Sequence, residues 1–366
     1  MTDQTFIETV QKLIAIQSTT DRPDDLRDAL AIIAGIISQV PGLTVEHFEE
    51  HGKPSLLAYK GNRRPERFTV LLNGHVDVVP GRPEQFEPFV KEDKLYGRGA
   101  LDMKTTALLM TQVFCDIAPK VPYALGLQMV TDEEVGGAHG TKLHIRQGVT
   151  ADFVIAGEFT PPGKICNESR GICWLEVDFA GQAAHSAYPW NGTNAILKAQ
   201  AFTQKLLEAY PVPPSDTWTT TVNIASLETT NSTFNRVPDA AKLKLDIRYV
   251  AEDPVFASEQ TMLAFMQGLD PSAKITVVEF EPSHFADPGN RLLKQLAASL
   301  SKETGQPTEF IKKHGASDVR YYSDHNMTAV VYGLSGSGLH SDEEYVLLSS
   351  VKTYRNTLNA FLESAA

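Results

Sequence analysis

The apolar positions of this chain predict alternating helices and strands in both of its outer parts. Apolar residues recur at helical spacing from about Asp3 to Ile16 and over Leu26–Val40. Helical stretches are also predicted over Met103–Ile117 and Gly289–Ser301. Short apolar runs rich in β-branched residues predict strands at Ser55–Ala58, Phe68–Leu72, Ala124–Thr131, Phe153–Ala156 and Thr328–Tyr332. Apolar strands that alternate with helices are typical of a largely parallel sheet covered on both faces.

The helix over Gly289–Ser301 also has recognisable end signals. Asp287 is a candidate N-cap, Pro288 suits the first turn, and Gly305 can end the helix.

The middle of the chain has a different order of predicted elements. Strands at Ile172–Ala180, Thr219–Leu227, Ala241–Val250 and Ile275–Phe280 combine with helices at Thr193–Ala209 and from Asp253 to about Met266. The resulting order, β-α-β-β-α-β, is the plan of a small α+β domain. Lys242, Lys244 and Asp246 alternate with Leu243, Leu245 and Ile247, which predicts one polar and one buried sheet face.

These patterns predict an α/β protein with an inserted domain. Residues 1–170 and 284–366 form the two parts of a catalytic domain with a largely parallel sheet, and residues 171–283 form the inserted α+β domain. A sheet covered on one face leaves an edge strand free, and such an edge can pair with its own copy. We therefore expect a homodimer formed through the inserted domain.

Composition and charge narrow the functional classes. Apolar residues make up 42% and charged residues 21% of the chain, as in ordinary globular proteins. The net charge of −12 disfavours nucleic acid as a partner, and no apolar run approaches the ~18 residues of a membrane span. The N-terminus lacks the features of an export signal, and three cysteines are too few for a disulfide framework. We expect a reduced, cytoplasmic protein.

Four of the predicted strands run directly into acidic or histidine residues. Phe68–Leu72 leads to His75 and Asp77, and Ala124–Thr131 leads to Asp132, Glu133 and Glu134. Phe153–Ala156 leads to Glu158, and Thr328–Tyr332 leads through a glycine-rich segment to His340. In open parallel sheets, ligands bind outside the carboxyl ends of the strands. Asp102, at the start of a predicted helix, is a further candidate.

Each of these residues also has a structural explanation when it is taken alone. A lone histidine is more often a hydrogen-bonded residue than a ligand, paired glutamates often open a helix, and Asp102 could cap one. Their occurrence together favours a metal site, because clustered carboxylates are costly without a compensating cation. Mixed histidine and carboxylate donors suit zinc, with cobalt or manganese as alternatives, and five donors match two metals that share a carboxylate.

Six ordered segments of the chain resemble those of the M20 metallopeptidase and deacylase family. The segments are Gly74–Pro80, Gly97–Lys104, Thr131–Gly136, Gly157–Glu158, His185–Ala195 and Leu339–Glu344. The resemblance implies two zinc ions per subunit. His75, Asp102 and Glu158 would hold one, and Asp102, Glu134 and His340 would hold the other, with Asp102 as the bridge.

The resemblance also implies roles for residues that do not hold metal. Asp77 would orient His75, Glu133 would be the general base, and the Asp102–Met103 peptide would be cis. His185 would stabilise the oxyanion in the partner subunit's active site. Asn235 and Arg248 would bind the substrate's polar groups, and Gly336 and Gly338 would let backbone amides approach its carboxylate.

The leading hypothesis is therefore a dinuclear amide hydrolase acting on a small peptide or an N-acyl amino acid. A metallopeptidase of the exopeptidase or dipeptidase type is favoured, and an N-acyl-amino-acid deacylase is the alternative, because both reactions attack an amide carbonyl. A dimeric binding protein without catalysis is a remote alternative. A phosphatase would be expected to show basic residues in these segments, and they are not basic.

Overall fold

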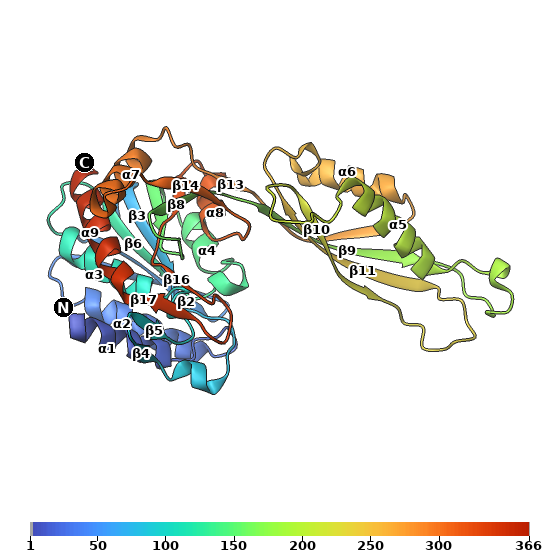
Figure 1. Cartoon of the computed structure of the whole chain (residues 1–366), viewed down its shortest axis with the longest axis horizontal. Coiled ribbons are helices and arrows are strands. Elements are labelled where there is room, and N and C mark those ends of the chain that lie inside the picture. Colours follow the sequence, from blue (N-terminus) through green and yellow to red (C-terminus); the bar gives the residue numbers. More distant parts are fainter. Residues whose placement is uncertain (1–2, 366) are drawn as a thin grey trace. The chain divides into compact units, whose positions relative to one another are not determined.

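The computed structural model describes residues 3–365, which divide into two compact units (Figure 1). The first unit runs to Glu168 and resumes over Phe285–Lys312 and from Ser317 onward. The second unit comprises Ser169–His284 and Lys313–Ala316.

The first unit is built on a mixed sheet whose centre is parallel. Nine strands belong to it among the described residues, in the order β1-β2-β6-β3-β7-β15-β8-β13, with β14 paired to β8. Their bounds are β1 Leu43–Glu50, β2 Lys53–Lys60, β3 Phe68–His75, β6 Leu125–Val130, β7 Ala151–Ala156, β8 Lys164–Ser169, β13 His284–Phe285, β14 Glu309–Lys313 and β15 Thr328–Val331. β6, β3, β7 and β15 are parallel, whereas β1, β2 and β8 pair antiparallel. The predicted fold class is confirmed.

Two hydrophobic layers cover the faces of this sheet. Val70 and Leu72 of β3 face a core that includes residues of α1, α2, α3, α7 and α9, whereas Phe68 and Leu71 face a second core reached by α8. The helices are α1 Asp3–Ala15, α2 Pro23–Ile37, α3 Lys104–Ile117, α4 Thr141–Arg146, α7 Arg291–Thr304, α8 Val319–Asp324 and α9 Leu348–Ser364. Burial on both faces explains why the first part of β3, Phe68–Leu72, is mostly apolar.

The start of α7 differs from the prediction. Asn290 is the N-cap, and its Oδ1 accepts hydrogen bonds from the backbone N–H groups of Leu292 and Leu293. The predicted cap, Asp287, instead accepts from the Gly289 N–H in the preceding turn. Gly305 ends the helix as predicted, with a left-handed φ of 69°.

A third sheet was not predicted, because its strands have only two or three residues and show no periodicity. It has the order β16-β17-β5-β4, with bounds β4 Phe89–Lys91, β5 Lys94–Tyr96, β16 Gly336–Ser337 and β17 Tyr345–Leu347. Pairing of β17 with β5 brings the C-terminal segment next to the chain that leads into Asp102.

The second unit has the predicted β-α-β-β-α-β order. Its antiparallel sheet runs β10-β11-β9-β12, with two helices packed on one face. The bounds are β9 Gly171–Ala180, α5 Ala195–Ala209, β10 Thr221–Glu228, β11 Ala240–Tyr249, α6 Glu259–Leu269 and β12 Lys274–Glu281. Leu243, Leu245 and Ile247 are buried beneath the helices, and Lys242 pairs with Glu176 on the other face.

Short 3₁₀ turns complete the described chain. They are η1 Pro83–Phe86, η2 Glu133–Val135, η3 Pro189–Asn191 and η4 Pro254–Phe256. Across residues 3–365, no helix is both long enough and apolar enough to span a membrane. Cys115, Cys166 and Cys173 are buried, and none of them takes part in a disulfide in the described chain.

Candidate metal centre

Neighbouring parallel strands bring most of the predicted site residues to one edge of the sheet. His75 is the last residue of β3, η2 with Glu133 and Glu134 closely follows β6, and Glu158 closely follows β7. Because β6, β3 and β7 are adjacent and parallel, their carboxyl ends meet at the same edge. Asp102 lies just before α3.

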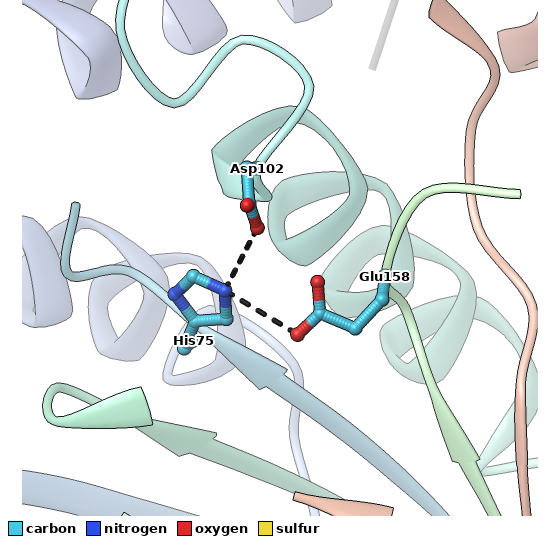
Figure 2. A group of neighbouring side chains, drawn as sticks. All are labelled: His75, Asp102 and Glu158. Carbon is cyan, nitrogen blue, oxygen red and sulfur yellow. Dashed lines mark hydrogen bonds and ion pairs between the residues drawn. The ribbon is translucent and has the colours of Figure 1, made fainter. Parts of the chain in front are cut away.

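Two groups of three side chains converge there, and Asp102 belongs to both. Nε2 of His75 lies 3.2 Å from Oδ1 of Asp102 and 3.4 Å from Oε1 of Glu158, and Figure 2 shows all three side chains pointing toward one another. Nε2 of His340 lies 3.2 Å from Oδ2 of Asp102 and 3.2 Å from Oε2 of Glu134. The two carboxylate oxygens of Asp102 therefore face different groups.

The donor set and its spacing fit divalent metal ions. Zinc bonds of about 2.0–2.1 Å in tetrahedral geometry place ligand atoms about 3.3–3.4 Å apart, close to the separations found here. Oε1 of Glu134 is buried and has no hydrogen-bond partner among the described residues. Three protein donors per ion leave a position for water or substrate.

The carboxylates around His75 and His340 favour positive charge on the two histidines. Burial alone would lower the pKa of His75, but the charge of Glu158 and the hydrogen bond to Asp102 raise it well above its usual value. Hydrogen bonds to Asp102 and Glu134 raise the pKa of His340 to about 10. In the metal-free protein, protons on the two imidazoles offset the carboxylates, and bound cations would replace those protons.

Glu133 and Glu134 sit in surroundings that disfavour their charged forms. Burial, followed by repulsion from Glu158, raises the pKa of Glu133 well above its usual value. Burial also raises the pKa of Glu134, although its hydrogen bond to His340 opposes the shift. A carboxylate with a raised pKa is suited to accepting and returning a proton near neutral pH.

Asp77 contacts both the histidine and the glutamate turn. Nδ1 of His75 donates to the backbone carbonyl of Asp77 at 3.0 Å, and Oδ1 of the Asp77 carboxylate lies 3.4 Å from the same nitrogen. Oδ2 of Asp77 accepts from the Glu134 N–H at 3.0 Å. Because Nδ1 donates, Nε2 is the nitrogen that would offer a lone pair to a metal once its proton is displaced, and it is the atom that faces Asp102 and Glu158.

Glu344 is a buried residue to which sequence reasoning assigned no role. Its Oε1 accepts from the backbone N–H groups of Leu101 and Asp102, at 2.9 and 3.1 Å, and its Oε2 pairs with Nη1 of Arg98 at 2.7 Å. Glu344 therefore fixes the backbone at Asp102, where the Asp102–Met103 peptide is cis as the resemblance implied. The one feature of the sequence that could have pointed to Glu344 is its position at the end of the family-like segment Leu339–Glu344.

Substituting glutamine for Glu344 is expected to lower the free energy of unfolding by about 3 kcal/mol, because it leaves the buried Arg98 without its charge partner. Denaturant unfolding of the metal-free protein measures the change. Glu343→Gln is the matched control, because Glu343 is the adjacent residue and is exposed. Equal stability of the two variants would contradict the assigned contact.

The turn that carries Glu133 and Glu134 is held by Asp132, which the sequence pattern singled out without a role, and by Tyr321, which it did not. Asp132 is buried, and its Oδ2 accepts from the backbone N–H groups of His139 and Gly140 at 2.7 and 3.1 Å. The hydroxyl of Tyr321 donates to the Gly136 carbonyl at 2.5 Å. Segments on both sides of the turn therefore fix its position.

The other predicted site residues have different surroundings. Gly338 is in the first unit, with a φ of 84°, and a Cβ there would lie 2.5 Å from the carbonyl oxygen of Glu343, so local packing also requires glycine. Gly336 is similarly restricted, because a Cβ at this position would lie 2.1 Å from the carbonyl oxygen of Tyr345. His340 has a left-handed φ of 57°, which non-glycine residues seldom adopt.

His185, Asn235 and Arg248 belong to the second unit. Nε and Nη2 of Arg248 donate to the two carboxylate oxygens of Asp246, at 2.8 and 3.2 Å. The carbonyl of Asn235 accepts from the Ser186 N–H, and Nδ1 of the exposed His185 accepts from the Ala187 N–H at 3.1 Å.

Known proteins resemble this chain over nearly its whole length. The model of peptidase family M20/M25/M40 matches residues 71–364. Succinyl-diaminopimelate desuccinylase from Orientia tsutsugamushi is 28% identical, covering 98% of this chain and 97% of the relative. Aminopeptidase PepT from Bacillus cereus matches with a TM-score of 0.81 and 18% identity, covering 100% of this chain and 99% of that chain. An M20 family metallo-carboxypeptidase from Sulfolobus solfataricus has a TM-score of 0.80 and 16% identity, with the same coverage. The two structural matches show a common fold.

Proposed function

The chain belongs to the M20/M25/M40 peptidase family of hydrolases that act on C–N bonds, and from this premise we propose that it is a dinuclear amide hydrolase. The observation that carries the proposal is the position of Asp102, whose two carboxylate oxygens face separate histidine–carboxylate pairs. We assign His75, Asp102 and Glu158 to one zinc ion and Asp102, Glu134 and His340 to the other. Cobalt or manganese would suit the same donors.

Glu133 acts as the general base in the proposed mechanism. Two divalent cations held by these residues would supply Lewis acidity, which would lower the pKa of water and polarise an amide carbonyl. The Glu133 carboxylate takes a proton from the attacking water, holds it, and delivers it to the leaving nitrogen. Asp77 keeps His75 and the Glu134 backbone in position throughout.

The substrate is proposed to be a small peptide, and an N-acyl amino acid is the alternative. The similarity to an aminopeptidase and a metallo-carboxypeptidase supports a peptidase of the exopeptidase or dipeptidase type. The similarity to desuccinylases supports the deacylase. Asn235, Arg248 and the backbone at Gly338 are proposed to bind polar groups of the substrate, with Arg248 sharing its guanidinium between Asp246 and a carboxylate.

Reconstitution of the metal-free protein tests the proposed function. The metal-free protein should be inactive and should recover amide hydrolysis with Zn²⁺ or Co²⁺. A panel of dipeptides, N-acetyl amino acids and N-succinyl amino acids separates the peptidase from the deacylase. Well under one bound metal per chain, together with no hydrolysis of any substrate, would overturn the proposal and favour a non-catalytic dimeric binding protein.

The second unit is proposed to be the dimerisation domain. β10 and β12 are the edge strands of its sheet, and an edge strand can pair with its copy about a twofold axis. His185 is proposed to reach the partner subunit's active site and donate to the substrate oxyanion. Because Nδ1 of His185 accepts a backbone hydrogen bond, its proton lies on Nε2, the nitrogen available to a substrate.

Replacing His185 with alanine is expected to lower kcat by about 10²–10³-fold and leave the metal content unchanged, because only the oxyanion donor is lost. Steady-state kinetics and metal analysis measure the two effects. His47→Ala is the matched control, since His47 is an exposed histidine on β1. Full activity of His185→Ala would contradict the proposed oxyanion role. If sedimentation shows that the fully active enzyme is a monomer, the proposed need for a dimer is wrong.

A further inference from the structure

Exposed aromatic side chains gather beside His185 in the second unit. We name Tyr188, Trp190 and Phe234 the aromatic tip. The exposed fractions of Tyr188 and Trp190 are 54% and 74%, and Phe234 is fully exposed. The segment between β9 and α5 and the segment between β10 and β11 that carry them lie at the same end of this unit in Figure 1. Large exposed aromatic side chains that cluster in this way commonly mark a binding surface.

Backbone hydrogen bonds hold the tip in one arrangement with His185. The ring of Tyr188 lies 5.9 Å from the ring of His185, and the ring of Trp190 lies 5.8 Å from that of Tyr188. His185 forms a β-bridge with Arg236, and the Ser186 N–H donates to the carbonyl of Asn235, the residue after Phe234. A substrate that accepts a hydrogen bond from His185 is therefore next to the ring of Tyr188, and the segments that carry Trp190 and Phe234 are joined to the backbone around His185.

The two segments that carry the tip contain a histidine, His185, but no carboxylate, ammonium or guanidinium side chain. Residues 181–197 and 229–235 contain no Asp, Glu, Lys or Arg, although the whole chain has a net charge of −12. The nearest basic residue along the second segment, Arg236, pairs with Asp239 at 2.6 Å. The tip therefore has no cation that could pair with an anionic substrate group. It does have large apolar surfaces on which an uncharged group could pack.

We propose that Trp190 and Phe234 determine specificity by binding an uncharged, preferably aromatic, group on the carbonyl side of the scissile amide. The inference rests on the proposed function, and in particular on the hydrogen bond from His185 to the carbonyl oxygen. It narrows the substrate class, because an anionic group such as succinyl has no charge partner on the tip.

This inference is tested by measuring kcat/KM of the zinc-loaded full-length enzyme on two series of substrates. Glycine is the leaving group in both series. One series is benzoylglycine, acetylglycine and succinylglycine, and the other is Phe-Gly, Gly-Gly and Glu-Gly. In whichever series is cleaved, the aromatic member should have kcat/KM about 10-fold or more above the small member, and the anionic member should be poorest.

Trp190→Ala and Phe234→Ala should each lower kcat/KM for the aromatic substrate by about 10-fold and change that for the small substrate by less than about 2-fold. Trp190→Phe should retain most of the preference. Phe285→Ala is the matched control, because Phe285 is an exposed phenylalanine outside the tip, with an exposed fraction of 57%. Its substrate preference should be unchanged.

The outcomes separate this inference from the proposed function. Hydrolysis without an aromatic preference, or a preference that both alanine variants keep, would overturn the inference alone. An equal loss on every substrate accompanied by a monomeric state in sedimentation would also overturn it, because the tip would then serve the subunit interface. No hydrolysis of these six substrates would overturn the inference, whereas the proposed function is decided separately by the metal content and the wider substrate panel.

Discussion

Substitution of Glu133 by glutamine is expected to lower kcat by about 10²–10⁴-fold while both metal ions remain bound. The amide has nearly the same shape as the carboxylate but cannot accept the water proton and return it to the leaving nitrogen. Glu133 belongs to neither group of converging metal donors, so its loss should leave metal binding intact. Steady-state kinetics and metal analysis on the same sample measure both effects.

Glu363→Gln provides the control for this substitution, because Glu363 is an exposed glutamate on α9. It should match the unsubstituted enzyme in both measurements. Turnover within a few-fold of normal in Glu133→Gln would exclude Glu133 as the base. Loss of metal from that variant would instead identify Glu133 as part of the metal-holding set.

Asp102→Asn should weaken the binding of both metal ions by about 10²-fold or more and abolish activity, because this one carboxylate faces both groups. Glu158→Gln, by contrast, should weaken only the ion assigned to His75, since Glu158 belongs to one group. Titration with zinc against a competing chelator measures the two affinities in each variant.

Asp116→Asn is the matched control for the bridging residue. Asp116 is an exposed aspartate in α3, the helix that begins just after Asp102. Its zinc affinities should be those of the unsubstituted protein. If Asp102→Asn keeps one ion at full affinity, Asp102 does not act as the bridge.

The central strands and the residues at their ends could be predicted from sequence for a physical reason. Strands that are mostly buried on both faces, such as β3 and β7, carry runs of apolar residues, and these runs stand out in the sequence. Parallel pairing then brings the residues that follow these strands to one edge, so His75 and Glu158 could be placed together before any coordinates.

Features that depend on distant contacts could not be predicted in this way. β1 is only partly buried, so its apolar pattern is weak, and the strands of the third sheet are too short for any periodicity. The role of Glu344 depends on its burial against Arg98 and the Asp102 backbone, which are far away in sequence. Asn290, and not Asp287, is the N-cap of α7. The two positions are only three residues apart, and residue propensities do not locate the start of a helix that closely.

The place of β15 in the central sheet has a consequence for how the chain folds as it is synthesised. β15 lies between β7 and β8, yet it follows the whole second unit in sequence. Until it leaves the ribosome, the inner edges of β7 and β8 have no partner, and unpaired apolar edges are prone to aggregate. The proposed metal donors His75, Asp102 and Glu158 precede the second unit in the sequence, whereas the proposed donor His340 follows β15. A nascent chain could therefore capture a first ion well before it can capture a second, and early metal capture would help to hold the unfinished sheet together.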